Sequence, residues 1–396
     1  MTEERSQIRR PKVLFLITED WYFWSHRLDL ARAVSYAGYD VFVATRVQDH
    51  GKRIEDEGFT LLPIRLLRRN RWPLQEVRAI QELIRLYHRI RPDIVHHVAM
   101  KPIIYGSWAA RLAGVPAVVN AFAGLGHAFI AGGPGTRILR FLLTRALKPA
   151  LSLPHSRVIF QNEQDAKELE HAGVVQPAQV AIIRGSGVDT AKFIPSPESD
   201  GDALVVLASR MLWNKGVGEF IAAVKVLNAQ GIRAKYALVG RVDQENPAHV
   251  PEKQLRQWQK EGLVEWWGHR EDMPQVLAHA HVVVLPTYYG EGMPKILLEA
   301  ASCGKPVIST NIRGCSEIVR DGKNGLVVPP KDVPALAQAI ATLLRDPALR
   351  AQMGACGREI VMKEFSVERI SRETLDLYGE LLGKTHDPQA GSLRRG

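Results

Sequence analysis

The sequence predicts an α/β protein built from two Rossmann-like domains, and three observations support this fold class. Short apolar runs typical of buried strands alternate with helical patterns, which indicates parallel sheets covered on both faces. This alternation occurs twice, on either side of a segment rich in Gly, Pro, Ser and Asp at residues 184–202. The chain has 396 residues, a length that suits two such domains better than one hydrophobic core.

The first series begins with a strand at 11–18, which an irregular stretch at 19–26 separates from a helix at 28–38. Further strands are predicted at 39–44, 59–64, 93–97, 117–120 and 158–161. Helices are predicted near 51–58 and across 74–91. We place the first domain at 1–190.

The second series forms a domain at 191–365. Its strands are predicted at 203–209, 235–239, 264–268, 281–285, 306–310 and 325–328. Its helices are predicted at 218–230, 251–262, 272–279, 333–345 and 347–364. A last helix is expected within 366–383. Residues 384–396 show no apolar periodicity, so a disordered tail is predicted there.

Composition is typical of a globular protein, with 46% hydrophobic and 24% charged residues. The three cysteines form no C-x-x-C pair, which argues against disulfides or a zinc cluster and fits a reducing cytoplasm. No apolar run is long enough for a signal-peptide core or a membrane span. The net charge is +10, of which the first 200 residues carry +7. This basic half suggests an anionic partner: nucleic acid, a membrane surface or a phosphorylated substrate.

The most informative stretch is PTYYGEGMPKILLEAASCG at 286–304. A buried strand leads into a loop, and Pro294 then opens a helix whose start is suited to bind an anion. Gly292 lets the backbone approach a ligand closely. Glu291 stands just before the helix, and Glu299 lies inside it among apolar residues, where a carboxylate needs hydrogen-bond donors. Ribose and sugar hydroxyls are suitable donors, whereas solvated or salt-bridged glutamates are the ordinary alternative.

This stretch resembles the E-x7-E signature of the retaining family 4 glycosyltransferases, which have the GT-B fold. The residues that match are Glu291, Gly292, Met293, Pro294, Leu298, Glu299, Ala300, Gly304, Pro306 and Val307. The match continues through Gly314, Cys315, Glu317, Val319, Asp321, Gly322, Gly325 and the VVPP at 327–330.

The resemblance implies that two Rossmann-like domains face each other across a cleft and that the C-terminal helix crosses back to the first domain. The second domain would hold a nucleotide sugar, most simply a UDP sugar, and the first domain would hold the acceptor. Glu299 would bind the ribose hydroxyls, and Glu291 would contact the sugar or its developing charge. The donor-binding segment would comprise Gly292, Met293, Pro294 and Lys295, and its backbone N–H groups, which proline lacks, would stabilise the departing diphosphate. Retention would follow from front-face attack by the acceptor.

Arg210 directly follows the predicted strand at 203–209, and Lys215 lies five residues later. Ligands of open α/β sheets bind at the carboxyl ends of the strands, and both side chains suit phosphate oxygens. Ordinary surface cations are the alternative. The pair also matches the family's R-x4-K, which implies that Arg210 and Lys215 grip the donor diphosphate and belong to the catalytic set with Glu291.

Several histidines of the first half fall at predicted strand ends or loops, and His26, His97 and His127 are candidates for acceptor or sugar contact. For any one of them a structural role is the simpler interpretation. Many family members carry a sugar-contacting histidine where this chain has Phe122, so that role does not transfer. The GLG at 124–126 and the FQN at 160–162 resemble a subgroup that builds bacterial surface polysaccharides on polyprenyl-diphosphate carriers.

No cofactor or metal is expected. Asp200-Gly201-Asp202 spells the D-x-D metal signature of a different transferase fold, but it lies in the linker, and we interpret it as a solvated turn. By resemblance, GT-B enzymes hold the diphosphate with helix ends and cations instead of a metal.

Two basic stretches bear on membrane binding. Arg137, Arg140, Arg145 and Lys148 lie on roughly one predicted helical face, with leucines and an isoleucine largely opposite, which is typical of a helix in a headgroup plane. The segment 65–91 contains eight arginines, and it fits a membrane-binding element and a core helix with a solvated arginine face equally well.

The sequence therefore predicts a retaining glycosyltransferase of polysaccharide or glycan biosynthesis that uses a lipid-linked acceptor at the inner face of the cytoplasmic membrane. A sugar-nucleotide 2-epimerase shares the fold and would act without an acceptor. A non-catalytic nucleic-acid-binding protein would explain the basic first half but not the ordered E-x7-E stretch, and no RNA-reading motif is visible.

Overall fold

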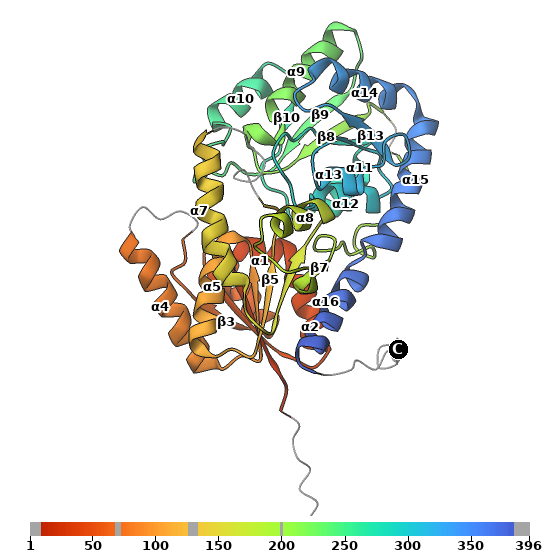
Figure 1. The fold of residues 1–396 in the computed structure, drawn as a ribbon. Helices are drawn as coiled ribbons and strands as arrows, with labels where there is room; N and C mark the ends of the chain where they lie inside the picture. Colours follow the sequence, from red (N-terminus) through yellow and green to blue (C-terminus); the bar gives the residue numbers. More distant parts are fainter. Residues whose placement is uncertain (1–8, 68–72, 126–133, 199–200, 384–396) are drawn as a thin grey trace, which may run out of the picture. The chain divides into compact units, whose positions relative to one another are not determined.

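The computed structural model describes residues 9–67, 73–125, 134–198 and 201–383, and within them the chain divides into two compact units. Unit 1 comprises the chain up to Ser186 together with the segment that starts at Ile370. Unit 2 runs from Gly187 to Arg369. Each unit contains one parallel β-sheet with helices packed against it (Figure 1).

The sheet of unit 1 has seven strands in the order β3-β2-β1-β4-β5-β6-β7. The strands are β1 (Lys12–Glu19), β2 (Asp40–Arg46), β3 (Thr60–Pro63), β4 (Ile94–Val98), β5 (Ala117–Ala121), β6 (Ser156–Phe160) and β7 (Val180–Ile182). The central strands β4 and β5 are buried along their whole length, as expected for a parallel sheet covered on both faces. Strand β7, which is only three residues long, is not predicted from the sequence.

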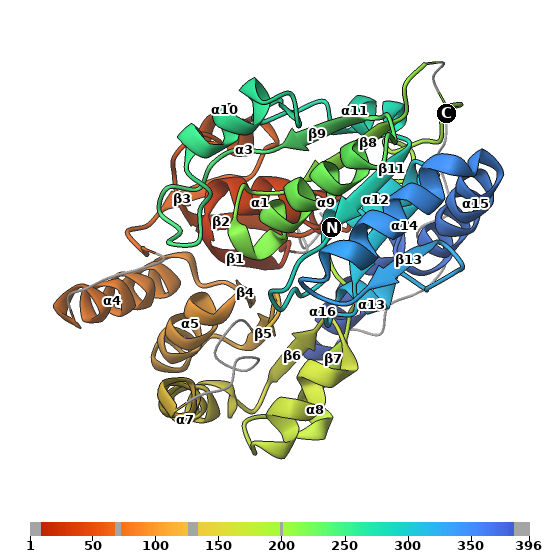
Figure 2. The same ribbon diagram turned by 90° about the horizontal axis from the view of Figure 1, so that it is seen from above.

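The helices of unit 1 connect these strands. They are α1 (Asp20–His26), α2 (Leu28–Tyr36), α3 (Gly51–Asp56), α4 (Pro73–Ile90), α5 (Met100–Ala113), α7 (Pro134–Leu151) and α8 (Glu163–His171). Helices α4, α5 and α7 pack side by side (Figures 1 and 2). The C-terminal helix α16 (Val367–Leu381) places Ile370, Leu377 and Tyr378 in the same core as β1, as the resemblance implied.

Residues 19–26 were predicted to be irregular, and this prediction is wrong because most of them form α1. The buried Asp20 fixes this helix. One of its oxygens accepts the N–H of Trp21 at 2.7 Å, and the other accepts the N–H groups of Gln48 and His50 at 2.7 and 2.8 Å. Phe23 is fully buried beneath the helix. Gln48 and His50 are distant from Asp20 in sequence, so local propensity could not reveal these two contacts.

The sheet of unit 2 has six strands in the order β10-β9-β8-β11-β12-β13. The strands are β8 (Leu204–Ala208), β9 (Lys235–Val239), β10 (Glu265–Trp266), β11 (Val282–Leu285), β12 (Val307–Thr310) and β13 (Gly325–Val328). The helices are α9 (Val217–Ala229), α10 (Glu252–Lys260), α11 (Met273–His279), α12 (Lys295–Ser302), α13 (Cys315–Ile318), α14 (Val333–Arg345) and α15 (Pro347–Glu364). Two hydrophobic clusters, one containing Val205 and the other Val206, show that this sheet is also covered on both faces.

Strand order reverses once in each sheet. In unit 1 the reversal lies between β1 and β4, and in unit 2 it lies between β8 and β11. At such a point the two connecting loops leave in opposite directions and open a crevice at the carboxyl ends of the strands. The strand order therefore predicts a ligand site in each unit at these positions.

Ala99, which directly follows β4 at the reversal in unit 1, has an unusual backbone conformation. Its φ of 74° and ψ of 164° lie in a region that glycine adopts readily and other residues avoid. Its N–H donates to Ala121 O at 3.0 Å, and the chain turns there directly into α5. Local backbone strain thus lies directly after β4, at the strand-order reversal of unit 1.

We predict that Ala99→Gly stabilises the protein by about 1 kcal/mol, because relief of strain outweighs the added freedom of the unfolded chain. Urea denaturation measures the free energy of unfolding. Ala110→Gly, inside α5, is the matched control and should destabilise by at least about 1 kcal/mol. Equal destabilisation by both substitutions would contradict the strain at Ala99.

Candidate active site

The predicted donor residues of unit 2 lie on two loops at the strand-order reversal. Arg210 and Lys215 occupy the connection between β8 and α9, and Glu291 lies between β11 and α12. Because β8 and β11 are adjacent, both loops leave the same edge of the sheet. Residues 76 positions apart in the sequence are therefore brought together.

Backbone contacts join these two loops. Tyr288 donates its N–H to Asn214 O at 3.1 Å, and the Thr287 hydroxyl lies 3.0 Å from the same oxygen. Gly216 has a φ of 80°, and a Cβ at this position would lie 2.2 Å from Pro286 O. Only glycine permits this close approach. The two loops thus form one rigid platform.

Lys215 and Glu291 form an ion pair on this platform, between Lys215 Nζ and Glu291 Oε1. Their side chains are only 15% and 12% exposed. The Thr287 hydroxyl lies 3.1 Å from the same carboxylate oxygen. Removal of one member of such a pair leaves a desolvated charge, so each residue holds the other in position.

Arg210 is held by a carboxylate that the sequence analysis did not identify. Its Nη1 lies 2.7 Å from Oδ2 of Asp243, whose side chain is 14% exposed. Asp243 follows β9, the strand beside β8, so the sheet order brings the two residues together. The position of Asp243 shortly after a predicted strand was a signal in the sequence. Its pairing with Arg210 could be recognised only once the strand order was known.

The E-x7-E stretch forms the start of α12. Lys295 begins this helix, one residue later than predicted, and Pro294 occupies the N-cap. The Nζ of Lys295 lies 3.9 Å from Oε1 of Glu299, and the two side chains are 17% and 14% exposed. The predicted carboxylate in an apolar helix is therefore mostly buried and has a cation close to it.

A second glycine fixes the loop before α12. Gly314 has a φ of 83°, and a Cβ there would lie 1.9 Å from Gly292 O. The neighbouring Cys315 is fully buried, and its burial, followed by the charge of Glu291, raises the pKa of its thiol to about 12. Cys315 is therefore protonated at neutral pH and supplies packing, not a nucleophile.

The two joined loops hold two cations and the start of α12 at the same edge of the sheet. Arg210 and Lys215 are each oriented by a carboxylate, and the N-terminus of α12 adds partial positive charge. Such preorganised groups stabilise negative charge that develops on a leaving diphosphate.

The three candidate histidines of unit 1 have different placements. His97 is fully buried, and its ring nitrogens lie 3.0 Å from Tyr87 Oη and 2.8 Å from Asn120 Oδ1. Burial lowers the pKa of His97 to about 4, so it is neutral and structural in this arrangement and offers no atom to a ligand. His26 ends α1, stacks on Tyr22 with ring centroids 4.3 Å apart, and remains partly exposed. His127 lies outside the described residues.

Phe122 occupies the position where many family members carry a histidine. It is 1% exposed and stacks on Phe160 with ring centroids 5.1 Å apart. Its side chain thus belongs to the hydrophobic core of unit 1.

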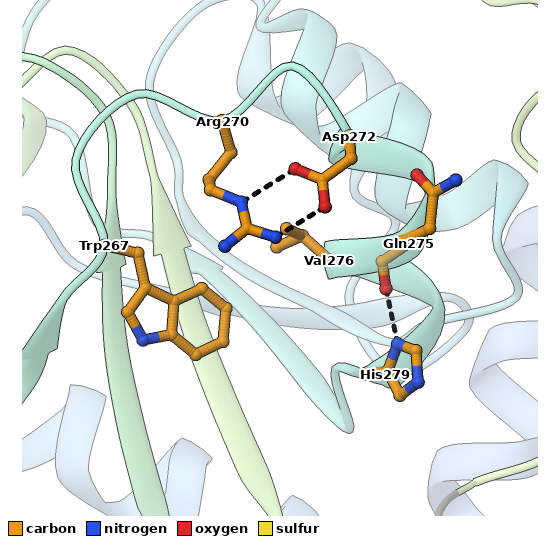
Figure 3. Close-up of a pocket in the computed structure, with 6 residues that line it drawn as sticks. All are labelled: Trp267, Arg270, Asp272, Gln275, Val276 and His279. Atoms are coloured by element: carbon orange, nitrogen blue, oxygen red, sulfur yellow. Dashed lines mark hydrogen bonds and ion pairs between the residues drawn. The ribbon is translucent and has the colours of Figure 1, made fainter.

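Unit 2 also has a cavity of about 430 Å³ beside α11 (Figure 3). Its lining residues are Trp267, Arg270, Asp272, Gln275, Val276 and His279. Arg270 makes two hydrogen bonds with Asp272, at 2.7 and 2.5 Å, so its charge is compensated. None of the predicted donor residues lines this cavity.

Among the described residues, no group of three or more His, Cys, Asp or Glu side chains is arranged to hold a metal ion. Asp200, half of the D-x-D sequence, lies outside that part of the chain. None of the helices in the described ranges is both long and apolar enough to cross a membrane.

Two family models match the chain, one within each unit. The model described as Glycosyl transferase 4-like matches residues 12–162. The model described as Glycosyl transferases group 1 matches residues 202–346.

Two curated relatives match over most of the chain. The N,N'-diacetylbacillosaminyl-diphospho-undecaprenol alpha-1,3-N-acetylgalactosaminyltransferase of Campylobacter jejuni is 26% identical, covering 90% of this chain and 95% of its own. The UDP-Gal:alpha-D-GlcNAc-diphosphoundecaprenol alpha-1,3-galactosyltransferase of Escherichia coli is also 26% identical, covering 78% of this chain and 81% of its own.

Among solved structures, HepE of Anabaena in complex with UDP and glucose superposes with a TM-score of 0.77 at 20% identity. The match covers 94% of this chain and all of that one. Because a glycosyltransferase model matches in each unit and the relatives align across both, the chain belongs to the family 4 glycosyltransferases of the GT-B fold.

Proposed function

We propose that this glycosyltransferase moves a hexosyl or N-acetylhexosaminyl group from a UDP sugar to a saccharide carried on a polyprenyl diphosphate, with retention of configuration. The observation that carries the proposal is the platform at the β8–β11 reversal. It pairs Lys215 with Glu291 just before α12, and Asp243 orients Arg210, which lies on the same loop as Lys215. Arg210, Lys215 and Glu291 match the family's motifs in type and spacing.

In the proposed reaction an acceptor hydroxyl oxygen forms a bond to the anomeric carbon while the bond from that carbon to the diphosphate oxygen breaks. The departing oxygen keeps the electron pair, and the hydroxyl proton passes to it on the same face of the sugar. Arg210, Lys215 and the N–H groups at the start of α12 stabilise the diphosphate charge as it develops. No covalent intermediate on the enzyme is required.

The two glutamates have separate roles in this proposal. Glu299, inside α12, accepts hydrogen bonds from the ribose hydroxyls. Glu291, at the end of the loop, contacts the sugar and compensates positive charge near the anomeric carbon. Its pairing with Lys215 keeps the carboxylate oriented.

Relatives support the substrate classes. The names of the Campylobacter jejuni and Escherichia coli enzymes specify diphospho-undecaprenol-linked acceptors and alpha linkages, and HepE was solved with UDP. A polyprenyl-linked acceptor is anchored in a membrane, so we place the working enzyme at the inner face of the cytoplasmic membrane.

The proposal is tested by offering the protein a panel of UDP sugars with a short-chain polyprenyl-diphosphate saccharide and identifying products by mass spectrometry. We expect an acceptor extended by one sugar, and undiminished transfer after treatment with EDTA, since helix ends and cations replace a metal. Conversion of donor without acceptor would instead identify a 2-epimerase. A strict requirement for Mg²⁺ or Mn²⁺ would overturn the metal-free mechanism.

We predict that Glu299→Ala abolishes UDP binding, whereas Glu291→Ala leaves UDP affinity nearly unchanged and lowers turnover. The reason is that UDP contains the ribose, which Glu299 would bind, but not the transferred sugar, which Glu291 would contact. Calorimetry with UDP separates the two variants. Glu291→Gln, which retains most of the side-chain volume, controls for collapse of the platform. Wild-type UDP affinity in Glu299→Ala would remove the proposed role of Glu299.

We also predict that Arg210→Ala and Lys215→Ala each cost about 2–4 kcal/mol of transition-state stabilisation in kcat/KM, as for loss of one preorganised donor. The double variant should lose less than the sum, because both cations serve one diphosphate. Asp243→Asn should lower kcat/KM in the same direction by releasing Arg210. Arg256→Ala, at an exposed cation on α10, is the matched control and should leave the kinetics unchanged. Near-wild-type rates in both single variants would contradict the assignment.

A further inference from the structure

The N-terminal half of α7 exposes an unusual amount of apolar surface. Among the described residues, eleven large hydrophobic side chains are exposed, and four of them lie within the five residues Ile138–Leu142. Ile138, Leu139, Phe141 and Leu142 are 63%, 47%, 62% and 58% exposed. Single exposed apolar residues are ordinary on protein surfaces, whereas a contiguous group marks an interaction site.

The C-terminal half of the same helix is anchored in the protein. Leu147 and Leu151 are fully buried in a cluster with Ile103 of α5. Arg140 forms an ion pair with Glu168 of α8 at 2.7 Å. The helix is thus held firmly by its second half and by Arg140, while its first half presents apolar side chains to solvent.

Cations lie among these apolar side chains. Positions three, four and seven apart share one face of a helix, so Arg145 lies in line with Ile138, Phe141 and Leu142. The sequence predicts cations and apolar residues on largely opposite faces of this helix, and Arg145 lies at the boundary between the two. Leu147 and Leu151, on the far side of the helix from Ile138, pack into the core. The segment 134–151 contains four basic residues and no acidic one.

The other basic stretch does not share this property. In α4 the residues Ala79, Leu83, Leu86 and Tyr87 are buried, and the helix packs against α5. Val77 is its one strongly exposed apolar side chain within the described residues. Helix α4 is therefore a core helix with a solvated arginine face.

We propose that the strip formed by Arg137, Ile138, Phe141, Leu142 and Arg145 inserts into the headgroup region of an anionic lipid bilayer. Phe141 and the aliphatic side chains reach the acyl boundary, and the arginines extend to lipid phosphates. The absence of acidic residues on this helix favours an anionic surface over a second copy of the chain. A two-fold interface would place this basic strip against itself.

This inference deepens the proposed function by naming the surface that meets the membrane of a lipid-linked acceptor. It can nevertheless be tested without any sugar transfer. If transfer to a short-chain acceptor in solution occurs but vesicles are not bound, the docking surface alone is wrong. If vesicles are bound but no acceptor is extended, the proposed function alone is wrong.

The experiment is flotation of the full chain with vesicles of phosphatidylcholine alone or mixed with phosphatidylglycerol. We expect binding that requires phosphatidylglycerol and falls steeply between about 50 and about 500 mM salt. The double variant Phe141→Ser, Leu142→Ser should weaken binding at least about tenfold, because it removes the inserted apolar area. Arg137→Gln with Arg145→Gln should also weaken binding and should flatten its salt dependence.

Leu112→Ser is the matched control, since Leu112 is 61% exposed on α5 of the same unit but lies outside the strip. It should bind vesicles as the wild type does, and all variants should keep wild-type melting temperatures and wild-type transfer to a short-chain acceptor. Failure of the wild type to bind anionic vesicles at low salt would overturn the proposal. So would equal binding by the double serine variant, or a wild-type dimer that this variant dissociates.

Discussion

Lys215 and Glu291 lie 76 residues apart in the chain and meet as an ion pair at the edge of the second sheet. Both side chains have lost most of their hydration, so neither charge is stable there without the other. The pair can form only if β8 and β11 are neighbours and their loops are held together. The hydrogen bonds from Tyr288 and Thr287 to Asn214, and the close approach at Gly216, meet that requirement. The other features of the donor site are built around this constraint.

The need of each desolvated charge for a partner also determines how the candidate donor site can respond to a ligand. Each cation proposed to hold the diphosphate is oriented by a carboxylate, Arg210 by Asp243 and Lys215 by Glu291. A diphosphate would compete with these carboxylates for the two cations, whose side chains are already held in place by the ion pairs. Unit 1 uses its polar residues differently. Asp20 and His97 are buried and satisfy internal hydrogen bonds, whereas His26 remains partly exposed.

Helix α7 shows how one sequence pattern can serve two purposes. Its second half covers the sheet of unit 1, and its first half presents an apolar strip that the protein itself does not cover. An amphipathic pattern alone cannot separate these purposes, because a core-facing stripe and a lipid-facing stripe have the same composition. The exposed fractions of Ile138 and Phe141 make the distinction.

The sequence by itself determined the α/β class, most strand positions and the family, because strand periodicity and motif spacing are local properties. The R-x4-K pair and the E-x7-E stretch could be recognised for the same reason. Only the tertiary structure decided which groups meet. Asp243 joins Arg210 because β9 lies beside β8, and α1 forms because Asp20 reaches the backbone near Gln48. It also decided that His97 is enclosed while Phe141 is exposed. Such outcomes depend on strand order and on which helix faces find a partner, and neither is encoded within a short segment of chain.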